Sequence, residues 1–145
     1  MKTIKVIAPA LLGVVGVSAV LLRTWPLINV VETGRTPEYP DIAPRQYRAS
    51  ATDVFDAALH AVTRMPRWSL VRYSEDRGDI QVEARTLVLR FVDDIVIRIA
   101  DHEPITTVNV RSASRIGRGD FGQNARNIRG FLKELDQQMQ QRVSH

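Results

Sequence analysis

The sequence predicts an α+β fold, with a four-stranded antiparallel meander, two helices on one face of it, and a preceding N-terminal transmembrane helix. Three observations support this prediction. Residues 6–22 are apolar and uncharged, two later segments repeat apolar residues at helical spacing, and the chain between them alternates apolar and polar residues, as half-buried strands do. We therefore divide the 145 residues into a membrane anchor or signal peptide (1–25), an extended linker (26–48) and an exported α+β domain (49–145).

The apolar run has the length and the flanking charges of a signal anchor. As a helix, residues 6–22 would be about 26 Å long, at the short end of what spans a bilayer. Two lysines precede the run and one arginine follows it, so the positive-inside rule puts the N-terminus in the cytoplasm and the domain in the periplasm. A cleaved signal peptide and a buried core helix are the alternatives. We favour an anchor that holds the protein in the cytoplasmic membrane through residues 4–25, because cleavage at the small residues would leave apolar residues at the new terminus.

The linker and the first helix follow. Residues 26–48 have prolines at positions 26, 37, 40 and 44 and no sustained period, which indicates an extended tether. Ser50-Ala-Thr-Asp53 resembles a capping box, and apolar residues then recur at helical spacing to about residue 65. Pro66 ends this predicted helix.

Four strands are predicted next, at residues 68–74, 79–85, 91–99 and 106–114. The first two form a hairpin around residues 75–78, whose composition is that of a turn. The three residues Leu87, Val88 and Leu89 between the second and third strands have two interpretations, core residues or an exposed apolar tip that meets a membrane or a partner, and we favour the core. Gly117 and Gly119 end the last strand, and a second helix is predicted to run from Asp120 to near the C-terminus.

The register of the last two strands is predicted from their apolar residues, because a one-residue slip would place apolar side chains opposite polar ones. Ile97 is expected opposite Val108, and Ile95 opposite Val110. The same pairing puts Asp94 opposite Arg111 on the outer face of the sheet. It puts Asp93 opposite Ser112 on the inner face, where Asp93 would cap buried polar groups.

Two stretches carry a family resemblance: Phe91-Val-Asp-Asp94, and Arg111-Ser-Ala-Ser-Arg115-Ile-Gly-Arg-Gly-Asp120-Phe-Gly-Gln-Asn124. Over roughly residues 47–135 the chain resembles the bacterial family catalogued as domain of unknown function 1499. The resemblance implies an exported or membrane-attached envelope protein, and no activity. This chain has Ile95-Val96 where members commonly have an acidic residue, which argues against a carboxylate cluster. The motif supplies ten candidate binding residues: Asp93, Asp94, Arg111, Ser112, Ser114, Arg115, Gly117, Asp120, Gly122 and Asn124.

No set of residues in the sequence has the spacing of a catalytic or metal site. Asp93 and Asp94 are neighbours on a strand and point to opposite faces, so they cannot share a proton. Neither motif serine has a nearby histidine to act as base. The three histidines are too far apart for a ligand pair such as His-x-x-x-His, and the chain has no cysteine. We therefore expect no catalytic residue, no metal and no cofactor.

The turn at residues 117–120 has two interpretations. Glycines, arginines and a helix N-terminus together can bind an anion. Asp120 at the N-cap would instead occupy the free N–H groups and repel an anion. We favour the cap, with Arg115 or Arg118 paired to Asp120.

The net charge of +4 and the 17 arginines are compatible with an anionic partner. Nucleic acid is not expected outside the cytoplasm, so the candidates are anionic lipid and an envelope polymer, while a protein partner stays unspecified. The first hypothesis is a non-enzymatic binding or scaffolding domain. The alternative is a hydrolase or transferase that acts on an anionic envelope substrate through Asp93, Asp120 and nearby arginines.

Overall fold

The structure is a computed structural model that describes residues 26–143. The predicted anchor and residues 144–145 lie outside the described residues. Among the helices of residues 26–143, none combines the length and the apolar character needed to cross a bilayer.

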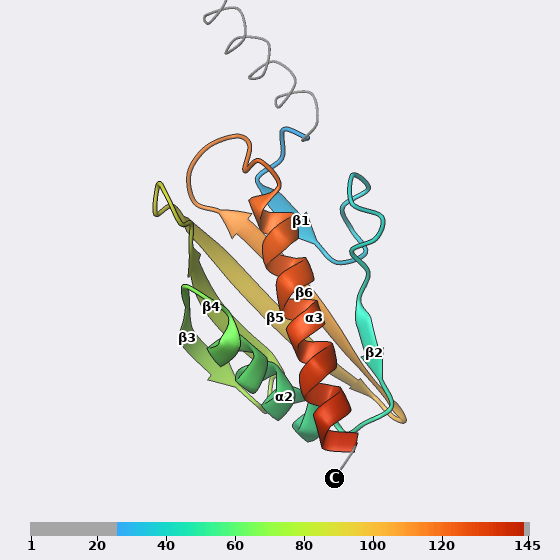
Figure 1. Cartoon of the computed structure of the whole chain (residues 1–145). Helices are drawn as coiled ribbons and strands as arrows, with labels where there is room; N and C mark the ends of the chain where they lie inside the picture. The colour runs from blue at the N-terminus through green and yellow to red at the C-terminus, as the bar shows by residue number, and fades with distance from the viewer. Residues whose placement is uncertain (1–25, 144–145) are drawn as a thin grey trace, which may run out of the picture.

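Six strands and two helices make up the described chain (Figure 1). In chain order they are β1 (Val30–Glu32), β2 (Arg45–Tyr47), α2 (Ala51–Arg64), β3 (Trp68–Ser74), β4 (Asp79–Arg85), β5 (Val92–His102), β6 (Ile105–Ser114) and α3 (Gln123–Val143). The α+β class is therefore confirmed, and the sheet has two strands more than the sequence predicted.

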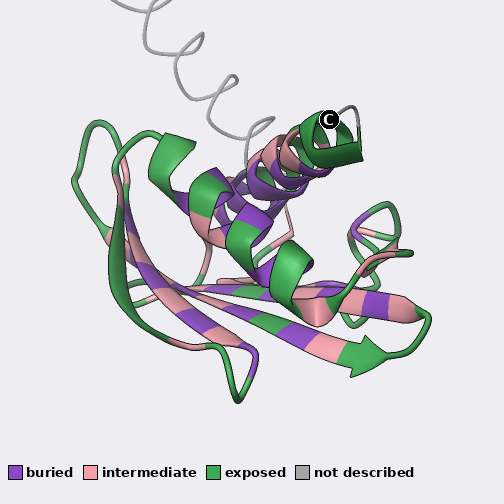
Figure 2. Cartoon of the chain, turned by 90° about the horizontal axis from the view of Figure 1, so that it is seen from below, coloured by how far each residue is buried: buried purple, intermediate pink, exposed green. Residues whose placement is uncertain are grey.

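The six strands form one antiparallel sheet in the order β1-β6-β5-β4-β3. On the side of β6 away from β5, β1 pairs with its C-terminal part and β2 with its N-terminal part. At the other edge, the register of β3 against β4 shifts between Leu70 and Arg72, which marks a β-bulge. Both helices lie on one face of the sheet, and the opposite face is left uncovered (Figure 2).

The core fills the space between the helices and the covered face. Ser50 caps α2 as expected, since its Oγ accepts a hydrogen bond from the Asp53 backbone N–H at 3.1 Å. The Trp68 ring stacks on Phe131 of α3, with ring centroids 5.9 Å apart. Burial of these apolar side chains is the main term that holds the helices to the sheet.

Residues 26–48 differ from the predicted linker. They contribute β1 and β2, and Val31 and Ile42 are buried in the core. The Tyr47 hydroxyl donates a 2.6 Å hydrogen bond to Asp136 of α3, which Arg45 also contacts at 3.2 Å. Each strand has only three residues, too few to show a period. Pro37, Pro40 and Pro44 lie in the connection between the two strands.

The register of β5 and β6 differs from the prediction by two residues. Ile97 lies opposite Val110, and Ile99 opposite Val108. Because side chains alternate with a period of two, this shift keeps every residue on its predicted face while changing its partner. The turn is shorter than expected: β5 continues to His102 and β6 starts at Ile105, so only Glu103 and Pro104 connect them.

The segment between β4 and β5 also differs. Leu87, Val88 and Leu89 are not core residues but are exposed, Val88 by 83%. Their hairpin tip extends past the end of β3, where no helix covers it (Figure 1).

Candidate functional site

The ten motif residues do not converge on one site. They lie in three places: inside the domain between β5, β6 and α3, in the connection from β6 to α3, and on the uncovered face of the sheet. The alternation of β5 and β6 causes this division, because successive residues of the motif point to opposite faces.

A buried polar network occupies the first place. It consists of Asp93, Ser112, Ser114, Asn124 and Asn127, four of which are less than 9% exposed. The hydroxyl of Ser114 donates to Oδ1 of Asp93 at 2.8 Å, and Nδ2 of Asn127 donates to Oδ2 at 2.8 Å. The hydroxyl of Ser112 donates to Oδ1 of Asn124 at 2.6 Å. These bonds join the sheet to the first two turns of α3.

The remaining hydrogen-bonding groups of the network are also paired. Nδ2 of Asn124 donates to Oγ of Ser114 at 2.9 Å and to the backbone carbonyl of Asn29 at 3.0 Å. Gln123 donates to Oδ1 of Asn127 at 2.9 Å. A buried polar group that is fully hydrogen-bonded avoids the cost of desolvation, so the network is compatible with a stable core.

Asp93 is the ionisable group of this network and is 2% exposed. Burial raises its pKa above the ordinary aspartate value, against the opposing effect of the hydrogen bonds from Ser114 and Asn127. Structurally it lies opposite Ser114, not Ser112 as predicted. Both of its oxygens accept hydrogen bonds from side chains. The carboxylate therefore connects β5 to β6 and to α3.

The side chain of Asp120 caps α3, as the sequence predicted, although the helix begins at Gln123, three residues later than expected. Its two carboxylate oxygens accept hydrogen bonds from the backbone N–H groups of Gly122 at 2.9 Å and Asn124 at 2.6 Å. Gly117 and Gly122 have positive φ angles of 91° and 76°, which glycine adopts without strain. The N–H groups that an anion would use are therefore occupied. The expected pairing of Arg115 or Arg118 with Asp120 is wrong: Arg115 binds other carboxylates, and no ion pair joins Arg118 to Asp120 within residues 26–143.

Arg115 binds two carboxylates on the uncovered face. Its Nε and Nη2 lie 2.8 and 2.6 Å from the two oxygens of Asp94, and Nη2 also lies 2.6 Å from Oε1 of Glu83. This guanidinium, with a smaller contribution from Arg111, lowers the pKa of Asp94. The predicted pair of Asp94 with Arg111 is wrong: Asp94 lies opposite Ala113, two residues before its actual partner Arg115. The strand register determines which residues lie opposite each other, but the long side chain of an arginine can contact a residue beyond the one opposite to it.

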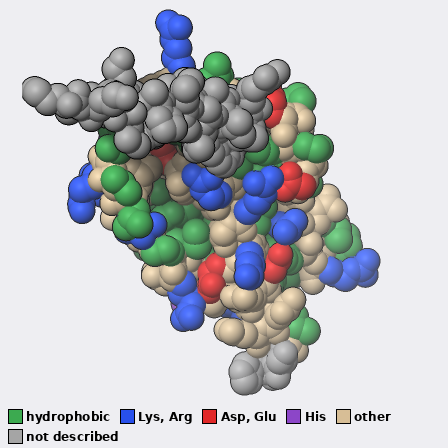
Figure 3. Space-filling model, turned by 45° about the horizontal axis from the view of Figure 1, so that its top comes forward, with side chains coloured by type: hydrophobic (Ala, Val, Ile, Leu, Met, Phe, Trp, Pro, Cys, Tyr) green, Lys and Arg blue, Asp and Glu red, His purple; other side chains and the backbone are tan. Residues whose placement is uncertain are grey.

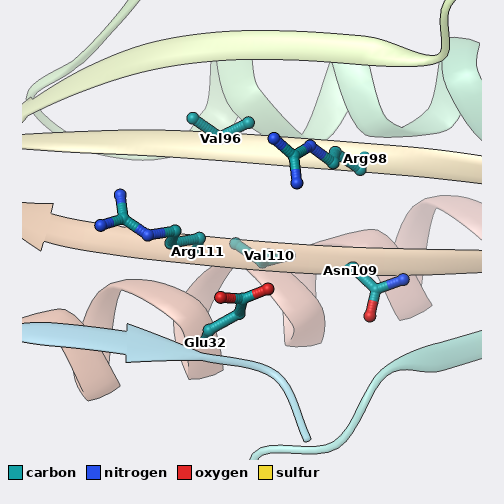
Figure 4. Close-up of a pocket in the computed structure, with 6 residues that line it drawn as sticks. All are labelled: Glu32, Val96, Arg98, Asn109, Val110 and Arg111. Atoms are coloured by element: carbon teal, nitrogen blue, oxygen red, sulfur yellow. The ribbon is translucent and has the colours of Figure 1, made fainter. Parts of the chain in front are cut away.

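Arg111 instead lines a hollow on the uncovered face. The hollow has a volume of about 210 Å³ and is lined by Glu32, Val96, Arg98, Asn109, Val110 and Arg111. Figure 4 shows it from outside, with Arg98 on β5 and Arg111 on β6 extending over the sheet and Glu32 on the neighbouring β1. Within residues 26–143, Arg111 has no carboxylate within 4 Å, and Arg98 reaches only Asp79, at 4.0 Å. Two weakly paired guanidiniums beside an amide can bind a carboxylate or phosphate.

The rest of the described chain offers little else for chemistry. Residues 26–143 contain no group of three or more histidine, aspartate and glutamate side chains arranged to hold a metal ion. Ser112 donates its proton to an amide oxygen, which cannot act as a general base. His60 and His102 lie on α2 and at the end of β5, and His145 lies outside the described residues.

Some residues of the buried polar network and of the hollow were not identified from the sequence. Asn127 and Asn29 complete the buried polar network, and Glu32 and Asn109 complete the hollow. The spacing of Asn124 and Asn127, three apart on a helix, places both amides on one face and could have indicated the first omission. Glu32 could not be found, because it depends on the pairing of β1 with β6.

The fold and the site thus define an α+β domain in which helices cover one face of the sheet and the other face is open. A buried polar network lies at the N-terminal end of α3. The chain belongs to the family described as "Protein of unknown function (DUF1499)", whose model matches residues 20–135. This match starts well before residue 47, so it includes β1 and β2, which the sequence resemblance did not. Comparison with the curated proteins gives no match.

Proposed function

We propose that the protein is a non-enzymatic binding or scaffolding domain, held at the periplasmic side of the cytoplasmic membrane by residues 4–25. Its ligand is an anionic envelope polymer, which binds on the open face of the sheet. The observation that carries this proposal is the hollow lined by Arg98 and Arg111. Among residues 26–143, Arg111 has no carboxylate within 4 Å, and Arg98 reaches only Asp79, at 4.0 Å. A carboxylate or phosphate group of the polymer would accept hydrogen bonds from these two guanidiniums.

The positions of the two motif carboxylates support a binding role over the alternative of a hydrolase or transferase. Such an enzyme would need Asp93 and Asp120 to face a substrate together with arginines. Asp93 is buried with both oxygens bonded to side chains, and Asp120 is bonded to two backbone N–H groups. The oxygens of each carboxylate are therefore hydrogen-bonded within the protein at the positions where they would have to contact a substrate.

Binding to isolated peptidoglycan sacculi tests the proposed ligand. The full chain in detergent micelles is mixed with sacculi and sedimented, and Arg98→Gln with Arg111→Gln is compared with Arg72→Gln, which changes an exposed arginine of the same face outside the hollow. Losing two charge-assisted contacts should weaken binding at least about tenfold. Equal sedimentation of both variants and the wild type would reject the open face as the binding site.

The membrane anchor has its own test. A periplasm-dependent reporter enzyme fused after His145 should be active, and the fusion should resist alkaline extraction from membranes. Activity of a cytoplasm-dependent reporter at the same position would contradict the proposed location. A mature protein that starts near residue 20 would favour the cleaved signal peptide.

A further inference from the structure

One end of the domain carries a group of exposed apolar side chains on three segments that are far apart in sequence. We define the apolar rim as these residues: Leu27, Leu87, Val88, Leu89, Phe91, Ile116 and Phe121, each between 41% and 83% exposed. Backbone hydrogen bonds hold the segments together, from Arg115 N–H to Val92 C=O at 3.1 Å and from Asp120 N–H to Ile28 C=O at 3.2 Å. The three segments meet where the described chain begins (Figure 1).

The charge that this end can offer to a partner comes from two of its four arginines. The segments 26–29, 85–91 and 115–122 contain four arginines and one carboxylate, Asp120, which caps α3. Arg85 is paired with Glu83, and Arg115 is paired with Glu83 and Asp94. Arg90 and Arg118 are exposed and have no ion pair within the described part of the chain. Figure 3 turns this end forward and shows basic side chains beside exposed hydrophobic ones.

The opposite end has the reverse character. Its two turns, residues 75–78 and 101–104, carry four carboxylates and one arginine, and neither turn has a large apolar side chain. The two turns are close together, because Glu75, Asp76 and Asp101 line a common hollow. These two turns therefore differ from the apolar rim in both charge and hydrophobicity.

The chain length before the domain limits how far the apolar rim can be from the predicted anchor. Leu27 is the fifth residue after Leu22, where the apolar run ends, and five extended residue steps span at most about 18 Å. Leu27 is itself packed near Gly119, since a Cβ on that glycine would lie 3.3 Å from Cδ2 of Leu27. The loop that carries Ile116 and Phe121 is thus tied to the first residues after the anchor.

We infer that the apolar rim and its arginines contact the anionic surface of the bilayer in which the anchor is embedded. Apolar side chains at loop tips enter the boundary between headgroups and acyl chains, and guanidiniums bind lipid phosphates in two-pronged contacts. The acidic turns at the other end are repelled by the same surface. This contact fixes the orientation of the domain and keeps its acidic end away from the membrane. The inference rests on the anchor of the proposed function.

Site-specific fluorescence can test the contact, because the chain has no cysteine of its own. Val88→Cys and, as the matched control at the opposite end, His102→Cys are labelled with an environment-sensitive nitrobenzoxadiazole dye. Each full chain is reconstituted at low density into vesicles of phosphatidylcholine and phosphatidylglycerol that contain a lipid with a nitroxide high on its acyl chain. Side chains at the interface lie about 5–10 Å into the headgroup and acyl boundary, so the label at position 88 should be quenched at least about threefold more than the label at 102.

A second comparison tests the charge contribution. Arg90→Gln with Arg118→Gln in the position-88 background should reduce the quenching, and Arg77→Gln, which lies in an acidic turn, should not. Vesicles of phosphatidylcholine alone should give the reduced value even without these changes. Equal quenching at positions 88 and 102 would overturn the inference. So would a disulfide between two copies of the unlabelled Val88→Cys chain in the same vesicles, if the labelled chain is not quenched by lipid, because the apolar rim would then be an interface with a second copy.

Alkaline extraction of the same vesicles separates this inference from the proposed function. A chain that resists extraction but is not quenched at position 88 keeps its anchor and overturns the rim contact. A chain that is extracted yet was quenched lacks the anchor, and it supports the rim as a peripheral contact with lipid.

Discussion

Asn127 on α3 donates a hydrogen bond to Oδ2 of Asp93 on β5, over 2.8 Å and between two buried side chains. The bond links the last helix to a strand in the middle of the sheet, 34 residues earlier in the chain. Asp93 is therefore part of the connection between the two layers, whereas its neighbour Asp94 is paired with Arg115 on the open face.

The two adjacent aspartates are expected to differ in their effect on stability. Asp93→Ala leaves the donors of Ser114 and Asn127 unpaired inside the protein, which should cost about 2–3 kcal/mol. Asp94→Ala removes an exposed ion pair and should cost about 0–1 kcal/mol. Urea denaturation of the full chain in detergent micelles measures both free energies of unfolding. A larger cost for Asp94→Ala would mean that the inward and outward faces of β5 are assigned wrongly.

The pH dependence of stability should also have opposite signs at these two positions. Because folding raises the pKa of Asp93, its contribution to stability falls as the pH rises above the ordinary value of about 3.9 and through the raised folded pKa. Because folding lowers the pKa of Asp94, its contribution is present above about 3.9 and is lost as the pH falls through the folded pKa.

The isosteric variants Asp93→Asn and Asp94→Asn make this measurable. From about pH 3 to pH 7, Asp93→Asn should become more stable relative to the wild type, and Asp94→Asn less stable. Denaturation curves at several pH values give both differences. Parallel pH profiles for the two variants would contradict the assigned environments.

The N-cap of α3 gives a third prediction. Asp120→Ala should lower the free energy of unfolding by about 1 kcal/mol, because two backbone N–H groups lose their acceptor. Asp76→Ala, an exposed turn residue, is the control and should change it by less than about 0.5 kcal/mol. A gain in stability for Asp120→Ala would instead identify a strained residue kept for binding.

Two tyrosines offer a matched comparison. The Tyr47 hydroxyl donates to Asp136, while the Tyr39 hydroxyl is buried and has no hydrogen-bond partner within residues 26–143. Tyr47→Phe should destabilise the protein by about 1–2 kcal/mol, because it leaves an acceptor on α3 without its donor. Tyr39→Phe should be neutral or slightly stabilising. Thermal melts of both variants would show whether β2 is held to α3 through this bond.

The elements with a clear period could be predicted from the sequence, and those without one could not. The capping box of α2 and the alternation of β4 located these elements within a residue or two. The strands β1 and β2 have three residues each and are defined only by their pairing with β6. The two-residue error in the β5–β6 register has the same origin, because alternation cannot distinguish registers that differ by two.

The candidate site was predictable in parts. The motif and the face on which each residue lies followed from strand alternation and placed Asp93 inward and Arg111 outward. The hydrogen-bond and ion-pair partners of these residues could not be predicted, because hydrogen bonds such as the one from Asn127 depend on how a helix packs on the sheet. Leu87 and its neighbours were assigned to the core from hydrophobicity alone, which does not report how far a hairpin extends past the helices.

The bulge between Leu70 and Arg72 has a consequence for crowding. A protein confined to a bilayer meets copies of itself at high local concentration, and a regular free strand is a template for joining sheets edge to edge. β3 is the free edge at that end of the sheet order, and its bulge interrupts the row of N–H and C=O groups while Arg72 adds a charge. The irregularity therefore discourages aggregation, so that crowded copies can stay separate instead of polymerising through their sheets.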